Sequence, residues 1–521
     1  MNDADGEYNV RHRVQPEDPE ERRIQDEAAI AKFGKKQQLK RRFKSLSSIG
    51  LTCGLMLTWE VVLFTLQFGL SNGGPAGLIY GFIAAWIGVM LQAVVLAEMA
   101  SMIPLAGGPF NWVAILSPPW CKKFLSYLAG WLTVIAWQAF VAEVCYTCAS
   151  LIQGIVILTH PNHVPKLWHA TLLFYAVIAF GLFINTYLGR ILPQIESLTL
   201  ITYILGFFGV LIPLVYLSPH SSAHLVFTTF QNLGGWRSMG LSFFVGWITS
   251  LTSFVGADGA DHIAEEIHQA SRVIPFSIWF STLFNGVMGF AMMLAILFST
   301  PDILTATESP TGFPFMTIFE TAMGHAAATA LVIVITAVNV VSVSSVLATA
   351  SRMLWAFSRE NGLPGSSWIV KVNPESRIPV NAIIVTVVIN VLLALISVGS
   401  TAAFAAFYSV VLAAYYASFI LSAGVMLHKR LTTPASEIPW GPFRLGRFGT
   451  PVTVVSLCYT IMAGFFTFWP GSVDVTTVTM NYSSLLFGAS ILLSMVFWIF
   501  YGRKIYVGPV WEFEGQFHRV D

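Results

Sequence analysis

The sequence is poor in charged residues. Only 11% of its 521 residues are Asp, Glu, Lys or Arg, whereas a soluble domain carries about 25%. Hydrophobic residues make up 55% of the chain, and uncharged runs of about 18 residues or more, the length that crosses a bilayer, recur along it. The composition excludes an ordinary soluble domain and predicts an all-α integral membrane protein with many spans. The formal net charge of +1 gives no reason to expect a nucleic-acid partner.

Several chemical signatures are missing from the sequence. It has no Gly-rich phosphate loop followed by Lys, which argues against ATP-driven transport. It shows no catalytic set and no His, Cys and carboxylate cluster with metal-ligand spacing, so we expect neither an enzyme nor a resident cofactor. The five cysteines are scattered, and Cys145 and Cys148, which have redox spacing, are interpreted as helix-packing residues. The polar first forty-odd residues do not form a signal peptide, so we expect the first spanning helix to target the chain.

Twelve membrane spans are predicted. Their approximate ranges are 46–70, 76–98, 124–157, 168–188, 194–217, 238–257, 273–299, 324–357, 379–398, 402–428, 450–470 and 482–502. Spans three and eight are long enough to be tilted. Lys and Arg favour the cytoplasmic side of a membrane, and this count places 26 of the 28 on one side, with only Lys166 and Arg237 opposite. Both termini are therefore predicted to be cytoplasmic.

Two of these spans lose their helical apolar pattern inside the membrane. Leu57-Thr58-Trp59-Glu60 interrupts the first span, and the stretch from Ser253 to Asp261 interrupts the sixth with two glycines and two carboxylates. Non-helical backbone at bilayer depth persists only where protein or a water-filled cavity satisfies it. Interrupted segments at matching places in two halves of a chain indicate a transporter's binding site. Free N–H groups at a break attract an anion and free carbonyls suit a cation, so a zwitterion could use both.

The spans divide into two similar sets. Spans one to five and six to ten each begin with an interrupted helix and have a long third member. Because five is odd, the second set enters the membrane from the opposite side, which predicts a five-plus-five inverted repeat with two extra helices. The predicted segments are a cytoplasmic N-terminal arm at 1–44, repeat one at 45–217, repeat two at 237–428, spans eleven and twelve at 450–502, and a cytoplasmic tail at 503–521.

Three motifs carry a resemblance to a known family. They are Ser71-Asn72-Gly73-Gly74-Pro75 with the stretch from Glu98 to Phe110, then Phe254 through Glu266, and finally Arg352 and Ala356-Phe357-Ser358-Arg359 with Gly362-Leu363-Pro364. Over about residues 45–505 the chain resembles the amino acid–polyamine–organocation (APC) superfamily, in particular its fungal amino acid/choline permease branch of choline and 4-aminobutyrate carriers.

The resemblance implies the LeuT-like APC fold, with the acid Asp258 below the binding pocket. Some proton-coupled relatives place a Lys in the fifth span, whereas this chain reads Leu200-Ile201-Thr202-Tyr203-Ile204 there. The resemblance therefore does not imply coupling by that route.

Eight residues from the two breaks and from spans three and eight are predicted to contact substrate. They are Thr58, Trp59, Glu60, Gln138, Phe254, Val255, Gly256 and Asn339. Glu60 could face a substrate cation or carry a proton, or it could be a structural acid tied to a neighbouring helix. Trp59 could stack on a quaternary ammonium or pack against helices, and Phe254 could close over the substrate or be an ordinary packing aromatic. Gln138 and Asn339 either line the path or bridge helices.

A second set of residues is predicted to move protons or to gate the path. It comprises Glu60, Asp258, Asp261 and Glu266. The acidic stretch 261–266 could pair with Lys40, Arg41 or Arg42 as an inner gate, or it could be a solvated charged helix.

Three other polar residues have weaker interpretations. Glu98 and Glu196 lie near the predicted inner face and are interpreted as structural. Asn481 begins an Asn-Tyr-Ser glycosylation motif on the predicted outer side, although an unmodified loop is the simpler interpretation.

The sequence thus predicts a secondary active permease that moves an amino acid, choline or a related small amine by alternating access. A proton gradient or the substrate's own gradient would supply the energy. Two alternatives stay open: an exporter or importer of an amine-type secondary metabolite or its precursor, and a nutrient sensor that does not transport. The expected location is the plasma membrane, and the expected partners are a small-molecule substrate and the lipid bilayer. The sequence gives no prediction of oligomeric state.

Overall fold

The computed structural model describes residues 19–300, 302–396, 403–477, 479–509, 511–513 and 516–518. Within these residues the chain is helical apart from loops and one short hairpin, which confirms the predicted all-α class. The longer helices are α1 (Pro19–Ala31), α2 (Ser45–Met56), α5 (Gly74–Met102), α7 (Lys122–Thr159), α8 (Leu167–Tyr187), α9 (Leu192–Leu217), α14 (Ala270–Phe298), α16 (Pro314–Met323), α17 (His325–Ser358), α19 (Val380–Ala394), α21 (Ala403–Thr432), α22 (Gly449–Phe466) and α23 (Ser483–Phe497).

Shorter elements connect or extend these helices. They are α3 (Thr58–Phe64), α4 (Leu66–Ser71), α6 (Pro109–Leu116), α10 (Ala223–Thr228), α11 (Met239–Gly246), α12 (Ile248–Thr252), α13 (Gly259–His262), η1 (Ala264–Glu266), α15 (Ile303–Thr307), α18 (Ser366–Ile369), η2 (Gly446–Phe448), η3 (Trp498–Gly502), α24 (Arg503–Ile505) and the antiparallel strands β1 (Trp511–Phe513) and β2 (Gln516–His518).

Ten helical stretches of the described chain are long and apolar enough to cross a membrane. They are Ser45–Phe64, α5, α7, α8, α9, α14, α17, Ala406–Thr432, Gly446–Phe466 and Ser483–Ile505. Two shorter apolar stretches, Met239–Thr252 and Val380–Ala394, lie where the sixth and ninth spans are predicted. The integral, multi-pass membrane class is confirmed, and the count of twelve spans stays a prediction.

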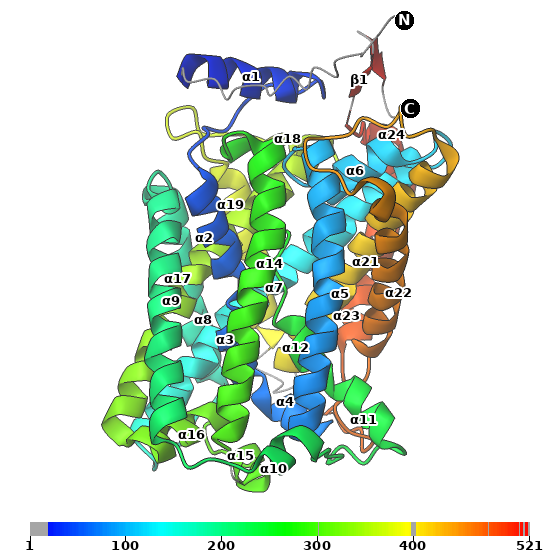
Figure 1. Ribbon diagram of the computed structural model, residues 1–521. Helices are drawn as coiled ribbons and strands as arrows, with labels where there is room; N and C mark the ends of the chain where they lie inside the picture. The colour runs from blue at the N-terminus through cyan, green and yellow to red at the C-terminus, as the bar shows by residue number, and fades with distance from the viewer. Residues whose placement is uncertain are drawn as a thin grey trace, which may run out of the picture.

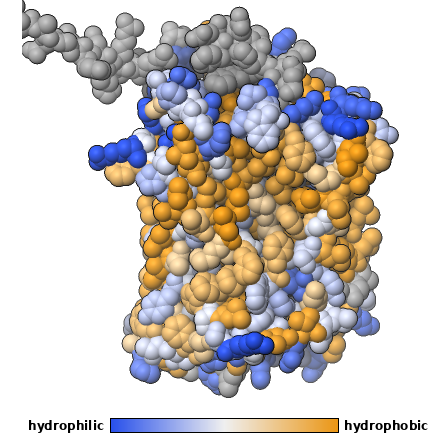
Figure 2. Space-filling view, turned by 90° about the vertical axis from the view of Figure 1, so that its right-hand side faces the viewer, coloured by the Kyte–Doolittle hydropathy of each residue, from blue (hydrophilic) through white to orange (hydrophobic). Residues whose placement is uncertain are grey.

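The helices form a bundle with an apolar outer surface. Figure 2 shows hydrophobic side chains across the middle of one face and hydrophilic side chains gathered at its two ends. The stretch Ser45–Phe64 lies deep in this bundle, since 83% of its apolar window is buried, compared with 11% for the last stretch, Ser483–Ile505. The first span is therefore central, and the last one is peripheral and faces the surroundings of the protein.

The two ends of the bundle carry different elements. Helices α1, α18 and α24 lie at one end, called the arm end below, and α10, α11, α15 and α16 lie at the opposite end (Figure 1). Arg42 ties three loops together at the arm end. Its guanidinium donates to the carbonyl oxygens of Gly189 at 3.1 Å and Ser376 at 2.7 Å, and its backbone N–H donates to Glu266 at 2.8 Å. The loops that contain Gly189, Glu266 and Ser376 therefore meet at the arm end.

Candidate substrate site

The first predicted break lies at Leu57. Helix α2 ends at Met56, Leu57 adopts a left-handed conformation with φ 41°, and α3 begins at Thr58. A leucine with positive φ is uncommon, because its side chain crowds the backbone there. The Leu57 N–H donates back to Cys53 at 2.9 Å, and the Leu57 carbonyl accepts from Glu60 at 2.9 Å. The interruption is confirmed, but it is shorter than the predicted tetrapeptide because Thr58 to Glu60 are already helical.

The second predicted break is longer. Helix α12 ends at Thr252, residues 253–258 form no helix, and the short α13 begins at Gly259. Gly256 has φ 94°, and a Cβ atom on it would lie 2.9 Å from the Leu55 Cβ in the last turn of α2. Glycine is therefore required both by the backbone conformation and by the close approach of α2. The contact brings the two breaks side by side.

The residues of the first break point toward three different helices. The Thr58 methyl group faces Gly289 of α14. The Trp59 ring packs against Tyr203 and Phe207 of α9, with centroid distances of 5.7 Å and 6.1 Å, which favours the packing interpretation of Trp59. Glu60 faces α17, so it is the residue of this break that meets another predicted site residue.

Glu60 accepts a hydrogen bond from the Asn339 amide of α17. The carboxyl group is fully buried, and its other oxygen, Oε1, has no hydrogen-bond partner among the described residues. Asn339 also donates to the Ile335 carbonyl at 3.0 Å, which fixes its side chain on α17. No Lys or Arg of the described chain forms a salt bridge with Glu60. The site therefore contains a carboxyl group whose partner in the protein is a neutral amide.

The other predicted contacts divide between the site and helix packing. The Phe254 ring packs against Phe82 of α5 at a centroid distance of 5.3 Å, and Val255 beside it is buried. Gln138 of α7 donates to the Thr386 hydroxyl at 3.3 Å and accepts from the Asn390 amide at 3.3 Å, both on α19. Gln138 thus bridges α7 and α19 and is not brought together with the residues of the breaks.

The second break brings two carboxyl groups and an imidazole together. Asp258 Oδ2 lies 3.1 Å from His262 Nε2, while both oxygens of Asp261 are buried without a hydrogen-bond partner among the described residues. One donor atom from each of the three residues lies within 4.8 Å of the others. The sequence analysis found no such cluster. It missed this one because the non-helical backbone turns the three side chains to one place. The arrangement suits a shared proton or a bound cation.

Aromatic side chains from two other helices surround this cluster. The Trp137 ring of α7 lies 4.9 Å from the His262 ring, edge to face. Tyr415 of α21 is buried near Asp258 and Asp261, and its hydroxyl has no hydrogen-bond partner among the described residues. The cluster therefore lies between α7 and α21, in the interior of the bundle.

The acidic stretch after the second break pairs with arginines of α17. Arg352 Nε lies 2.8 Å from Glu266 Oε1, and Arg359 Nη1 lies 2.9 Å from Glu265 Oε2. Both glutamates are buried, so the interpretation as a solvated charged helix is wrong. The expected partners Lys40, Arg41 and Arg42 do not form salt bridges with these carboxylates in the described structure.

The arm contacts the backbone of the same stretch instead. The Arg41 guanidinium donates to the Ile267 carbonyl and lies 3.6 Å from Asp26 of α1. Phe43 pairs with Ile267 as an isolated parallel bridge. Arginines of α17 therefore pair with the carboxylates of this stretch, while the arm bonds to its backbone.

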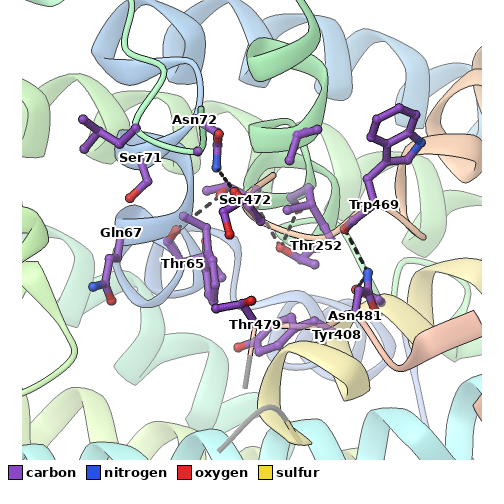
Figure 3. A pocket seen from close by; sticks show the side chains of 18 of the residues that line it. Thr65, Gln67, Ser71, Asn72, Thr252, Tyr408, Trp469, Ser472, Thr479 and Asn481 are labelled. Carbon is purple, nitrogen blue, oxygen red and sulfur yellow. Dashed lines mark hydrogen bonds between the residues drawn. The ribbon is translucent and has the colours of Figure 1, made fainter. Parts of the chain in front are cut away.

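A cavity opens beside the first and sixth spans, away from the arm end, and we call it the vestibule. Its volume is about 490 Å³. Figure 3 shows side chains of α4, α12, α21 and the segment 469–481 around it. The lining residues are Thr65, Gln67, Phe68, Ser71, Asn72, Leu233, Gly234, Val245, Ile248, Thr249, Thr252, Tyr408, Ser409, Trp469, Gly471, Ser472, Thr479, Met480 and Asn481. None of them carries a charge at neutral pH.

The comparison with known protein families decides the classification. The amino acid permease family matches residues 43–491 of the chain. The chain belongs to this family. The expected membership of the APC superfamily, and of its fungal amino acid/choline permeases, is thereby confirmed.

Proteins similar to this permease occur in fungi and plants. A choline transporter of Saccharomyces cerevisiae is 31% identical over 92% of the chain and 85% of its own length. Amino-acid permease 2 of Neurospora crassa is 26% identical over 92% of the chain and 89% of its own length. The amino-acid permease BAT1 homolog of Oryza sativa is 29% identical over 94% of the chain and 96% of its own length. The family and these names indicate a transporter for amino acids or amines rather than an enzyme.

The predicted glycosylation acceptor is buried in this permease. The Asn481 amide nitrogen donates to the Ser409 hydroxyl at 3.2 Å and to the carbonyls of Thr467 and Trp469 at 3.0 Å each. Its oxygen accepts from the Ser483 N–H at 3.0 Å. A glycan on the amide nitrogen would disrupt this network, so the structure supports the unmodified interpretation.

Sequence reasoning missed the vestibule. Tyr408 lies in an apolar run of the tenth span with no break, Gly-rich turn or charge beside it. Thr65 and Thr252 look like ordinary helix residues, yet both line the cavity. No local pattern distinguishes these positions, because the cavity forms where five separate segments of the chain meet.

Proposed function

We propose that this permease is a secondary active transporter of an amino acid, choline or a related small amine, working by alternating access. One observation carries the proposal. Two interrupted helices touch at Leu55 and Gly256 deep in the bundle, and the buried Glu60 beside them lacks a basic partner among the described residues. Such a site offers free backbone groups and a carboxyl group to a small charged ligand.

We also propose the twelve-span, five-plus-five inverted repeat. The lengths of corresponding helices support it: α5 and α14 both have 29 residues, and the third members α7 and α17 have 38 and 34. The interrupted helices α2–α3 and α12–α13 stand at the beginning of each set. Two unrelated halves would have no reason to match in both respects.

The residues divide into roles under this proposal. Glu60 and Asn339, with the backbone around Thr58 and Phe254 to Gly256, would hold the substrate. Asp258 and Asp261 would share a proton, because two adjacent buried carboxyl groups cannot both be charged without a large cost. Glu266 would close the inner gate through Arg352.

The conformation of the molecule is consistent with a carrier open on one side. The vestibule opens away from the arm end, whereas two buried salt bridges and the arm cover the site at the arm end. With the arm end placed in the cytoplasm, as the basic residues favour, this is an outward-open state. We propose the plasma membrane as its location, with a proton gradient or the substrate's own gradient as the energy source.

Counterflow in proteoliposomes tests this function. Vesicles containing the purified protein are preloaded with unlabelled choline, 4-aminobutyrate or lysine, and uptake of the same labelled compound is measured. Transient accumulation above equilibrium is expected for at least one of them. Binding without counterflow would identify a nutrient sensor, and counterflow of other amines alone would favour the carrier of an amine-type secondary metabolite.

A further inference from the structure

No charged side chain lines the vestibule. Its lining consists of hydroxyl, amide, aromatic and aliphatic groups. A site that discriminates between charged and neutral molecules by ion pairing must therefore use a charged group behind this lining, where water is scarce and electrostatic interactions are stronger.

Tyr408 belongs to this lining, as Figure 3 shows. Its hydroxyl lies 3.1 Å from the Thr147 hydroxyl of α7 and forms a hydrogen bond with the Glu143 carboxyl group of the same helix. Thr147 stands one turn after Glu143 and donates to the Glu143 carbonyl at 2.9 Å. The phenol of Tyr408 therefore separates the open cavity from a buried acid.

Glu143 has no basic partner in the described structure. The acid is 6% exposed, and no Lys, Arg or His side chain of the described residues lies within salt-bridge distance of it. Glu98 shows the contrast, since its buried carboxylate is paired with Arg430. Burying a carboxylate costs free energy unless a cation or a proton compensates its charge. For Glu143 no cationic side chain of the described residues does so.

Glu143 and Glu60 border the same region. Cys148, which follows Glu143 on α7, lies near Glu60 and near Tyr408. A ligand that passes Tyr408 would therefore meet Glu143 in the same interior region as Glu60. The two acids come from α7 and α3, which belong to different parts of the bundle.

We propose that Glu143, reached from the vestibule through Tyr408, binds the ammonium group of the transported molecule. This assignment rests on the proposed function and narrows the substrate class to compounds with a primary or quaternary ammonium. A primary ammonium would donate hydrogen bonds to the carboxylate, and a quaternary ammonium would attract it by charge alone, so either would compensate the buried acid. The ring of Tyr408, whose face attracts cations, would lie beside the bound ligand.

The first arm of the test needs no variant. For the compound that shows counterflow, inhibition of uptake is compared between that compound and a partner of similar shape that lacks an ammonium group. The partners are 3,3-dimethyl-1-butanol for choline and butyrate for 4-aminobutyrate. For lysine they are 6-aminohexanoate, which lacks the α-ammonium, and 6-hydroxynorleucine, which lacks the ε-ammonium. The partner is expected to inhibit about tenfold to a hundredfold less, which is the range for loss of a hydrogen-bonded charge. Equal inhibition by both would overturn the proposal.

The second arm compares variants of one acid. Glu143→Gln is expected to raise the KM about tenfold to a hundredfold and to make inhibition by the charged and uncharged compounds similar. Glu143→Asp keeps the charge but moves it, so it should raise the KM less and preserve the discrimination. Glu320→Gln is the matched control, because Glu320 lies partly exposed beside His325, away from the vestibule.

The outcomes separate this proposal from the proposed function. Counterflow that persists in Glu143→Gln with unchanged KM and unchanged discrimination would overturn the role of Glu143 and leave the carrier intact. If Glu143→Gln does not fold, Glu143→Asp and the comparison of compounds decide the question. Absence of counterflow with every compound in the native protein would instead overturn the proposed function.

Discussion

The buried acids of this permease differ in their partners between the arm end and the region of the breaks. At the arm end each acid contacts a basic side chain, and the pairs are Glu98–Arg430, Glu265–Arg359, Glu266–Arg352 and Glu360–Lys35. Nearer the breaks three buried glutamates have neutral hydrogen-bond partners in the described structure, and the pairs are Glu60–Asn339, Glu143–Tyr408 and Glu196–Ser345. Asp258 lies beside the His262 imidazole.

The difference shows that buried acids in one bundle can be compensated in two ways. A paired acid is compensated within the protein, so removing its partner or its charge destabilises the fold. An acid with neutral partners is compensated by something that comes and goes, such as a proton or a ligand cation. Replacing a carboxyl group by an amide should therefore lower stability strongly at the arm end and change stability little near the breaks.

The largest effect is expected for Glu266→Gln. The change leaves the buried Arg352 guanidinium without its anionic partner, which costs about 3–5 kcal/mol. Thermal unfolding in detergent should show a clear fall in the midpoint. Glu27→Gln is the matched control, because Glu27 and Arg23 form an exposed i,i+4 pair at 3.7 Å, and such pairs contribute little. A midpoint unchanged in both variants would remove the distinction at the arm end.

Glu60→Gln tests the region of the breaks. The variant should keep the hydrogen bond from Asn339 in a rearranged form and reach the membrane, while transport efficiency falls about tenfold to a hundredfold through loss of the charge. Uptake in proteoliposomes and protein content in the membrane are measured together. Unchanged uptake across the pH range would remove Glu60 from the mechanism.

Asp258→Asn should impair turnover more than binding. The amide still accepts a hydrogen bond from His262, but it cannot exchange a proton with Asp261, so the maximal rate should fall about tenfold, the equivalent of about 1.4 kcal/mol in the barrier. Binding affinity and maximal rate are measured on the same preparation. Equal losses of both in a folded protein would contradict a role in gating or proton transfer.

The smallest effect is expected for Glu196→Gln. The Ser345 hydroxyl, 2.6 Å from Glu196 Oε1, can donate equally to an amide oxygen, so stability should change by less than about 1 kcal/mol. The comparison with Glu266→Gln is the most direct, since both acids are buried in the bundle. A loss of stability as large as that of Glu266→Gln would show that partners do not divide the acids in this way.

The sequence was sufficient to predict the helices and the places where they break. Apolar runs gave the long helices to within a few residues, and the loss of pattern at Leu57 and after Thr252 coincides with the ends of α2 and α12. These features depend on neighbours along the chain. Glu60, an isolated acid in an apolar run, could be recognised for the same reason.

The directions of side chains could not be predicted, because they depend on helices distant in the sequence. The Trp59 ring packs against an aromatic residue of α9, and the Gln138 amide donates to a side chain of α19. The partner of Glu266 is Arg352, 86 residues later, and not a residue of the nearby basic arm. Periodicity gives the faces of one helix, but only the packed bundle decides which neighbour each face meets.

The contact between Leu55 and Gly256 has a mechanical consequence. The two interrupted helices meet here with no spare volume for another carbon atom. Under the alternating access proposed above, the two segments would have no room to move independently at this point, so they would move together. Simultaneous opening toward both compartments would then be disfavoured by steric exclusion rather than by charge.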